Sequence, residues 1–551
     1  MISAVWKSRL FDRFSMTGLT VGLIFFALSL TPSLIPRNIL IQGAVSGVSL
    51  LIGYGLGAGF IVLWKFLEIP LIEGRFRAII STVAITLAAA FAGLWLYRAS
   101  EWQNSVRELM EMEPIQTGSP FAVSLIAVLV FLICLAISRS FDLTRMAVQK
   151  RMSRIVPARV SLVLAVTIAL TVFWLVGNGL IFRSALDGLD NVFRALDEIV
   201  DVKIPDTDAG RQQSKLDWEK LGHAGRNYLA LGPTAEQIEA VTSRPAMKPI
   251  RVYVGMRSAE TAEERAQMAL EELIRQGGFD RSALVIATPT GTGWMDPAAF
   301  DTMEYLRGGD VATVGMQYSY LASWLSLVVE PDNGLISARA LFDAVYGYWR
   351  ELPADQRPKL YLFGLSLGAH NSSRSASLLQ IMSDPIDGAV WAGPPFVNSI
   401  WHAVTDARED GSPAWLPVVH DGENFRFRNQ YSDPPAADDD WGPMRIQYLQ
   451  YASDPIVFFE TTSFLLEPEW MRTPRGRDVS PEFAWYPAVT GVQLLIDMMI
   501  ATTTKIGHGH VYHPAHYLDS WIEVMGQNDL PSETVDRISE TVMKSIEDQT
   551  K

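Results

Sequence analysis

The stretch Lys359-Leu-Tyr-Leu-Phe-Gly364-Leu365-Ser366-Leu367-Gly368 decides the fold of the C-terminal part of this chain. Its apolar first half predicts a buried strand, and residues 369–382 after it have the composition of a helix. Between them, Gly-x-Ser-x-Gly is typical of a sharp strand-to-helix turn that raises a serine hydroxyl above a sheet. The alternative is an ordinary glycine turn with a bystander serine. The strand before the turn and the helix after it favour Ser366 as a nucleophile.

Strands and helices alternate on both sides of this turn. Helices are predicted at Thr261–Arg275 and Ala338–Glu351. Alternation of this kind is typical of βαβ units, and it predicts an α/β domain with a mostly parallel sheet. The other predicted strands are Ile250–Met256, Ala283–Thr288, Val311–Tyr318, Gly388–Trp391 and Met444–Tyr451.

A serine nucleophile needs a base, and the base needs an acid that orients it. In folds with this turn the chain order is serine, then acid, then histidine. The strand Met444–Tyr451, which we place second to last in the sheet, is followed closely by Asp454 and Pro455. An acid just past the end of a parallel strand lies at the same sheet edge as the serine turn. Asp454 is therefore the candidate acid, and a turn-forming Asp before proline is the alternative.

The base is expected in a loop before the last helical region. Four of the eight histidines lie within ten residues there, at positions 508, 510, 513 and 516. We rank His510 first and His508 second, and we assign His513 and His516 to the surface or to a supporting role. A metal site built from this cluster is the alternative. A metal hydrolase does not need the serine turn, so we predict neither a metal nor another cofactor.

Acyl transfer also needs hydrogen-bond donors for the charge that develops on the carbonyl oxygen. One donor is expected to be the N–H of Leu367, the residue after the nucleophile. The second should come from an early strand-to-helix loop, and the Pro/Gly-rich loop 288–294 follows a predicted strand. Thr290 or Gly291 is therefore the second candidate donor, with a plain turn as the alternative.

The N-terminal part has a different character. Five long runs without Asp, Glu, Lys or Arg lie in residues 1–182. A membrane-spanning helix needs roughly 20 mostly apolar residues. We therefore expect an α-helical transmembrane domain of about five spans over 1–182, a connector over 183–248 and the α/β domain over 249–551. The predicted spans are Met16–Leu34, Ile39–Trp64, Ala78–Tyr97, Phe121–Ser138 and Val160–Phe182.

Positive charge alternates between the connections of these spans. The N-terminal segment and the connections after the second and fourth spans carry 3, 3 and 6 Lys or Arg residues, whereas the other two carry 1 and 2. Basic connections tend to stay in the cytoplasm. We therefore expect a multi-pass protein of the cytoplasmic membrane with its N-terminus in the cytoplasm. Five spans then put the α/β domain on the extracytoplasmic side.

Composition and charge exclude several classes of protein. With 49% hydrophobic and only 19% charged residues, the chain is not intrinsically disordered. A net charge of −14 offers no cationic field for nucleic acid. One cysteine excludes a disulfide framework and a cysteine-based zinc site. Residues 1–182 carry 15 basic and 8 acidic side chains, whereas the rest carry 31 and 52, which suits two different environments.

Short motifs in both parts of the chain carry a family resemblance: Thr31-Pro-Ser-Leu-Ile-Pro-Arg37, Gly53-Tyr-Gly-Leu-Gly57, Pro249-Ile-Arg-Val-Tyr-Val-Gly255, Ala287-Thr-Pro-Thr-Gly-Thr-Gly-Trp294, Met316-Gln-Tyr-Ser-Tyr320, Ala392-Gly-Pro-Pro-Phe396, Ala452-Ser-Asp-Pro-Ile-Val457 and Gly507-His-Gly-His510. In these motifs the chain resembles a bacterial family of membrane-anchored α/β-hydrolases with an N-terminal multi-span domain. The resemblance covers nearly the whole chain and implies an α/β-hydrolase fold, but it does not imply a particular substrate. Where the family pattern has an acidic residue inside the serine turn, this chain has Leu365, so pocket polarity differs.

These expectations combine into a membrane-anchored serine hydrolase that cleaves an ester. Large apolar side chains such as Trp401, Trp415 and Trp470 are frequent after Trp391, where such enzymes carry a lid. An apolar pocket beside a lipid bilayer favours a lipid or acyl-ester substrate. Two alternatives stay open at this point. An acyltransferase would use the same three residues, and a non-catalytic membrane protein would use the fold only to bind a partner.

Overall fold

The computed structural model of the protein describes residues 14–71, 74–177, 197, 213–432, 441–527 and 529–549. The chain forms two compact units. The helical unit comprises residues 1–188 together with 459–472 and 479–500. The sheet unit comprises residues 189–458, 473–478 and 501–551. The helical unit therefore contains two pieces from the C-terminal part of the sequence.

Four helices of the helical unit are long and apolar enough to cross a membrane: α3 to α6, with apolar spans at Ile39–Phe66, Gly74–Leu109, Pro120–Met152 and Ala158–Gly177. Large apolar side chains such as Phe60, Leu87 and Leu129 are exposed on them, as expected for surfaces that face lipid. The N-terminal region is therefore built for a membrane. The helices of this unit are α2 (Met16–Leu28), α3 (Ile39–Phe66), α4 (Gly74–Leu109), α5 (Pro120–Met152), α6 (Ala158–Trp174) and α19 (Val489–Met499).

The first predicted span, Met16–Leu34, is shorter than expected. The helix there, α2, has 13 residues, which corresponds to about 20 Å, whereas the hydrocarbon core is about 30 Å thick. It ends at Leu28 because Pro32 and Pro36 follow, and proline has no N–H to continue a helix. At each of the other four predicted spans the structure has a helix that is long and apolar enough to cross a membrane, although the predicted end at Phe182 lies outside the described residues.

Small residues let α3 pack closely between α2 and α5. A Cβ at Gly47 would lie 2.7 Å from the carbonyl oxygen of Ala127, and one at Gly57 would lie 2.7 Å from that of Thr17. Gly47 and Gly57 end the Gly-x-x-x-Gly pairs Gly43–Gly47 and Gly53–Gly57, a spacing that lets helix backbones approach closely in lipid. Gly55 and Gly59 face open space instead.

The sheet unit contains a seven-stranded sheet in the order β1-β3-β2-β4-β5-β7-β6, with every pair parallel. Six strands match the predictions, and β6 is an additional edge strand. The strand that we expected second to last in the sheet, β7, is indeed next to the edge. The strands are β1 (Ile250–Val254), β2 (Ala283–Thr288), β3 (Val311–Met316), β4 (Lys359–Leu365), β5 (Gly388–Ala392), β6 (Phe425–Arg428) and β7 (Arg445–Leu449).

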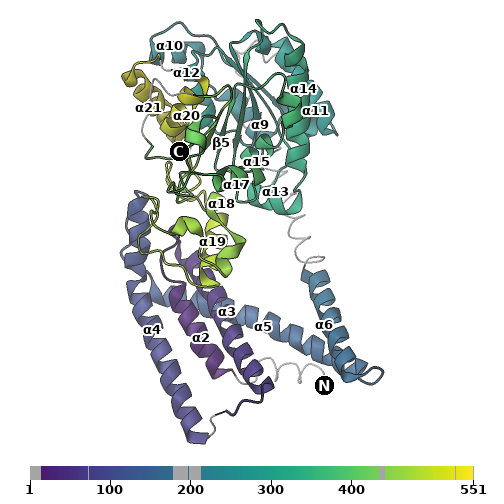
Figure 1. Ribbon diagram of the computed structural model, residues 1–551, viewed down its shortest axis with the longest axis vertical. Coiled ribbons are helices and arrows are strands. Elements are labelled where there is room, and N and C mark those ends of the chain that lie inside the picture. Colours follow the sequence, from purple (N-terminus) through teal and green to yellow (C-terminus); the bar gives the residue numbers. More distant parts are fainter. Residues whose placement is uncertain are drawn as a thin grey trace. The chain divides into compact units, whose positions relative to one another are not determined.

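Helices cover both faces of this sheet (Figure 1). On one face α11 (Ala262–Arg275) and α14 (Asn333–Glu351) pack together against the strands. On the other face α20 (Pro514–Met525) packs with α12 (Pro297–Leu306) and α21 (Ser532–Gln549). The remaining α-helices of the unit are α9 (Gly222–Ala230), α10 (Ala235–Thr242), α13 (Ser323–Val329), α15 (Leu367–Ser373), α16 (Leu378–Ile381), α17 (Ser399–Asp406) and α18 (Pro455–Phe458).

Two features correct the expected helices. The single helix expected over 369–382 is divided into α15 and α16. The expected connector 183–248 contains α9 and α10 in its described part, and these helices contribute Tyr228 and Ile238 to the core of the sheet unit.

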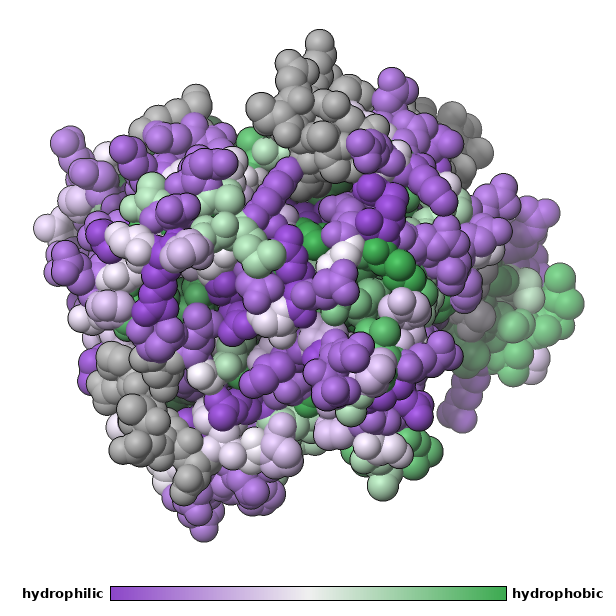
Figure 2. Space-filling model, turned by 90° about the horizontal axis from the view of Figure 1, so that it is seen from above, coloured by the Kyte–Doolittle hydropathy of each residue, from purple (hydrophilic) through white to green (hydrophobic). Residues whose placement is uncertain are grey.

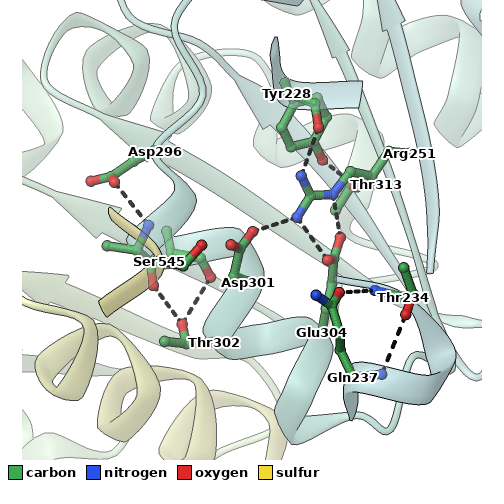
Figure 3. Close-up of polar contacts among 12 residues, drawn as sticks. Tyr228, Thr234, Gln237, Arg251, Asp296, Asp301, Thr302, Glu304, Thr313 and Ser545 are labelled. Atoms are coloured by element: carbon green, nitrogen blue, oxygen red, sulfur yellow. Dashed lines mark hydrogen bonds and ion pairs between the residues drawn. The ribbon is translucent and has the colours of Figure 1, made fainter. Parts of the chain in front are cut away.

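A buried ion-pair cluster joins β1 to α12 (Figure 3). Arg251 Nε lies 2.6 Å from Glu304 Oε1, and its Nη2 lies 2.6 Å from Asp301 Oδ1. Its Nη1 donates to the carbonyl oxygen of Tyr228 at 2.7 Å. Each charge is therefore paired inside the core.

The face of the molecule shown in Figure 2 is mainly hydrophilic.

Candidate active site

Ser366 occupies a strained turn between β4 and α15. Its backbone has φ 57° and ψ −126°, a conformation that costs a residue other than glycine about 1–3 kcal/mol. The Ser366 N–H donates to the carbonyl oxygen of Ala392 at 2.9 Å, which ties the turn to the end of β5. The structure therefore contains the elbow that the Gly-x-Ser-x-Gly motif predicts.

The elbow leaves no room for a Cβ atom at either flanking glycine, Gly364 or Gly368. A Cβ at Gly364 would clash with the backbone of Gly368, and a Cβ at Gly368 would clash with the carbonyl oxygen of Thr288. The loop after β2 therefore lies directly against the elbow, consistent with β2 and β4 being neighbours.

Gly368→Ala should destabilise the sheet unit by about 1–3 kcal/mol, because the new methyl group must displace backbone rather than a flexible side chain. The measurement is the thermal unfolding midpoint of the detergent-solubilised protein. Gly347→Ala is the matched control, since Gly347 lies in α14 with open space around its Cβ position. The control should be stabilising by about 0.5–1 kcal/mol. Equal midpoints for the two variants would contradict this account of the elbow.

Asp454 and His510 are in direct contact. His510 Nδ1 lies 2.6 Å from Asp454 Oδ2, and the Asp454 carboxylate is fully buried. The Tyr512 hydroxyl also donates to Oδ2 at 2.6 Å, and the Ile456 N–H donates to Oδ1 at 2.9 Å. Three donors therefore hold this carboxylate in one orientation just past the end of β7.

The loop that carries His510 is closed by its own backbone. The His510 N–H donates to the carbonyl oxygen of Ala501 at 3.1 Å, and the Gly507 N–H donates to that of Val511 at 2.7 Å. The Gly509 N–H donates to Ser453 Oγ at 3.1 Å, which ties the loop to the residue before Asp454. The two predicted residues thus lie on segments that are bonded to each other.

His510 is placed to accept a proton. With the Nδ1 proton directed at Asp454, Nε2 carries a lone pair, and within the described residues Nε2 has no hydrogen-bond partner. A Cβ at Gly393 would lie 2.5 Å from His510 Cε1, so the ring lies beside the end of β5 to which Ser366 is bonded. Ser366 Oγ and Nε2 are not hydrogen-bonded in this structure. Such a bond often tightens only when substrate is present.

The other histidines have structural environments. His516 Nδ1 lies 2.6 Å from the Tyr451 hydroxyl, and burial lowers the pKa of His516 to about 3. The His513 side chain caps α20 by accepting the Ala515 N–H at 3.1 Å. In the helix after the elbow, burial and the Arg374 charge lower the pKa of His370 to about 4. Near neutral pH His370 and His516 are therefore uncharged. The imidazole that meets Asp454 is that of His510 and not that of His508.

The oxyanion donors are only partly arranged as predicted. The Leu367 N–H is in the first turn of α15, where helical amides lack an acceptor within the helix. However, the Thr290 N–H donates to the carbonyl oxygen of Trp294 at 3.1 Å, and the Gly291 N–H donates to Ser323 Oγ at 3.1 Å. The loop has the predicted place beside the elbow, but each of these amides is occupied. One of these two bonds must open before Thr290 or Gly291 can donate to an oxyanion.

Two further residues support the site, and the sequence analysis did not assign them this role. Burial next to Asp454 raises the pKa of Tyr512 well above its usual range, so this hydroxyl stays protonated and donates. Asp478 Oδ2 accepts the Ser453 N–H at 2.9 Å and so holds the segment that carries Asp454. The sequence signal that could have identified Tyr512 is its position two residues after His510.

A second buried acid, Asp296, interacts electrostatically with His510. Asp296 is buried at the start of α12, where it accepts the Ala298 N–H at 3.0 Å (Figure 3). Burial raises the pKa of Asp296 to about 7. Hydrogen bonds from the Ala298 N–H and the Tyr517 side chain oppose this rise in the pKa, and the electrostatic interaction with His510 opposes it more weakly. Its charge therefore changes near neutral pH.

Within the described residues, no group of three or more His, Cys, Asp or Glu side chains is arranged to hold a metal ion. His510, His513 and His516 instead have the separate contacts given above.

Comparison with known proteins gives a match over most of the chain. Residues 250–538 match the model of a family described as alpha/beta-hydrolase family, and residues 30–233 match one described as alpha/beta-hydrolase family N-terminus. No curated protein and no solved structure matches the chain.

Proposed function

The chain belongs to this alpha/beta-hydrolase family, and from this premise we propose that it is a membrane-anchored serine hydrolase that cleaves an ester. Ser366 is the proposed nucleophile, His510 the base and Asp454 the orienting acid. The observation that carries the proposal is the 2.6 Å contact between His510 and Asp454, with the free Nε2 beside the strand end that is bonded to Ser366.

In this mechanism Ser366 Oγ attacks the substrate carbonyl carbon while His510 Nε2 takes the hydroxyl proton. Asp454 keeps the imidazole in the tautomer that has its proton on Nδ1 and stabilises the imidazolium that forms. The Leu367 N–H is the proposed donor to the oxyanion. His510 then gives its proton to the leaving alcohol. Water attacks the acyl-enzyme in the second half of the reaction, with His510 again as the base.

An apolar acyl group is the proposed substrate feature. Trp294 at the end of the loop after β2 and Trp324 in α13 are exposed to 44% and 38%, and Val328 in α13 is exposed to 64%. The Gly291–Ser323 hydrogen bond holds this loop against the start of α13, and the same loop lies against the elbow where the carbonyl oxygen of Thr288 meets Gly368. Exposed apolar groups beside a site favour a lipid or other acyl ester. Transfer of the acyl group to an alcohol instead of water is the second candidate, because the same three residues serve both reactions.

The experiment is covalent labelling of the full-length, detergent-solubilised protein with a fluorophosphonate probe, followed by turnover of acyl esters of increasing chain length. Labelling that needs Ser366 and persists in EDTA is expected. Wild-type protein that neither labels nor turns over any ester would instead favour a non-catalytic binding protein. Activity that is lost in EDTA and restored by Zn²⁺ would favour the metal alternative.

We further propose that the sheet unit is on the extracytoplasmic side of the cytoplasmic membrane. The helix ends on either side of the α3–α4 connection carry Lys65, Arg75 and Arg77, and six basic residues flank the turn between α5 and α6. Basic connections favour the cytoplasm, so α6 would lead outward. The proposed side of the sheet unit follows from these two connections, so it does not depend on whether the short helix α2 crosses the membrane. Only the predicted cytoplasmic N-terminus requires that α2 and its flanks also cross.

Cysteine accessibility tests this orientation in the intact chain. Cys134 is the single native cysteine, so Cys134→Ser gives a background without thiols. In spheroplasts, a membrane-impermeant maleimide should label Lys544→Cys in exposed α21. It should label Ser153→Cys, between α5 and α6, only after lysis. The reverse pattern would contradict the proposed orientation.

A further inference from the structure

The segment between the proposed acid and base belongs to the helical unit. Asp454 is followed by the short helix α18, and Phe459 begins the first piece that groups with the membrane helices. The second piece ends at Ile500. Ala501 follows directly, and its carbonyl oxygen accepts the His510 N–H at 3.1 Å. A single peptide bond, between Ile500 and Ala501, therefore links the segment that belongs to the helical unit to the residue that accepts the His510 N–H.

A buried ion pair fixes this segment at α19, which lies beside α3 in Figure 1. Arg37 Nε lies 3.0 Å from Asp497 Oδ1, and both side chains are fully buried. The other oxygen, Asp497 Oδ2, accepts the Leu34 N–H at 3.1 Å. Both carboxylate oxygens are thus used by the Thr31–Arg37 connection between α2 and α3.

Neighbouring amide side chains complete the contact. Gln493 Nε2, one turn earlier in α19, donates to the carbonyl oxygen of Thr31 at 3.1 Å. Arg37 Nη1 donates to Gln42 Oε1 at 3.1 Å, and the Arg37 N–H donates to Gln103 Oε1 at 2.8 Å. Residues of α3, α4 and α19 therefore converge on Arg37. Charged side chains inside a membrane unit are costly to bury, and they mark functional positions. Anchoring alone would not require this buried pair.

We propose that Arg37 and Asp497 are positioning residues for His510. This inference rests on the proposed function, in which His510 is the base. The pair holds the C-terminal end of α19, and Asp497 is four residues before Ala501, the residue that accepts the His510 N–H. The membrane helices thereby take part in catalysis through chain continuity and do not serve only as an anchor.

The physical consequence is a displacement of the base when the pair is broken. Removing one partner leaves the other charge buried and unpaired, which favours a shift of α19 away from the Thr31–Arg37 connection. A misplacement of about 1 Å at a catalytic group can cost about 10²-fold in rate. The loss should appear in kcat, because the pair does not belong to the residues proposed to meet the substrate.

The experiment compares Arg37→Gln, Asp497→Asn and the double variant in the full-length protein. Each single variant should lower kcat for an acyl ester, and the rate of fluorophosphonate labelling, by about 10²-fold with KM nearly unchanged. The double variant has no unpaired charge and should recover most of the loss. Arg37→Lys keeps the charge and should be impaired less than Arg37→Gln. Asn104→Ala is the matched control, since its amide in α4 binds the Ile115 backbone.

Four outcomes would overturn the inference while leaving the proposed function intact. They are wild-type kcat in both single variants, additive losses in the double variant, a loss that lies in KM, and an equal loss in Asn104→Ala. If the single variants do not insert into the membrane, Arg37→Lys and the double variant test the inference instead. Wild-type kcat in Arg37→Lys together with a large loss of kcat in the double variant would then overturn the inference. Absence of Ser366-dependent labelling in the wild type would refute the proposed function itself.

Discussion

Ser366→Ala should abolish fluorophosphonate labelling and lower ester turnover by about 10⁴-fold or more, because members of a nucleophile–base–acid set act as a unit. The substitution removes one oxygen atom from a residue that keeps its backbone bond to Ala392. The protein should therefore insert and unfold at nearly the wild-type temperature. The loss would then report chemistry and not folding.

Ser375→Ala is the matched control for this change. Its hydroxyl is buried and donates to the carbonyl oxygen of Ser372 at 2.8 Å, nine residues after the elbow. Labelling of this variant at the wild-type level is expected. If Ser366→Ala were labelled as strongly as the wild type, Ser366 would have to be removed from the mechanism, and another nucleophile would have to be sought.

Local patterns in the sequence predicted much of the sheet and of the proposed site. Six strands were predicted because each is a short apolar run bounded by turn residues. β6 was missed because it alternates Phe with Arg over only four residues at the sheet edge, where burial is partial. Asp454 was predicted from chain order and its position after a strand end. His510 was predicted from chain order and its loop before the last helical region, and the structure brings the two side chains into contact.

Features that depend on distant packing could not be predicted in this way. Arg37 and Asp497 are 460 positions apart, and nothing in either local pattern indicates that they meet. The apolar run after Met16 does not indicate that its helix ends at Leu28. The amides of Thr290 and Gly291 are occupied because the loop folds back on itself and on Ser323, which residue types alone do not encode.

His510→Ala should lower turnover about as severely as Ser366→Ala, because no other imidazole contacts Asp454 among the described residues. Asp454→Asn should cost about 10³- to 10⁴-fold, because an amide in that position favours the tautomer with its proton on Nε2, which cannot act as the base. The measurement is turnover of an acyl ester together with the rate of fluorophosphonate labelling. Adding Asp454→Asn to His510→Ala should cause little further loss, since the acid acts only through the base.

His508→Ala is the matched control, two residues earlier in the same buried loop. The hydrogen bond from the Thr504 hydroxyl to the His508 carbonyl oxygen, 2.7 Å long, does not need the imidazole, so the loop should keep its form. Measurable turnover and labelling are therefore expected. An inactive His508→Ala beside a normal His510→Ala would exchange the two roles. Full activity in both His508→Ala and His510→Ala would contradict the assignment of His510 as the base and Asp454 as the acid, because Asp454 would then orient a residue that the reaction does not use.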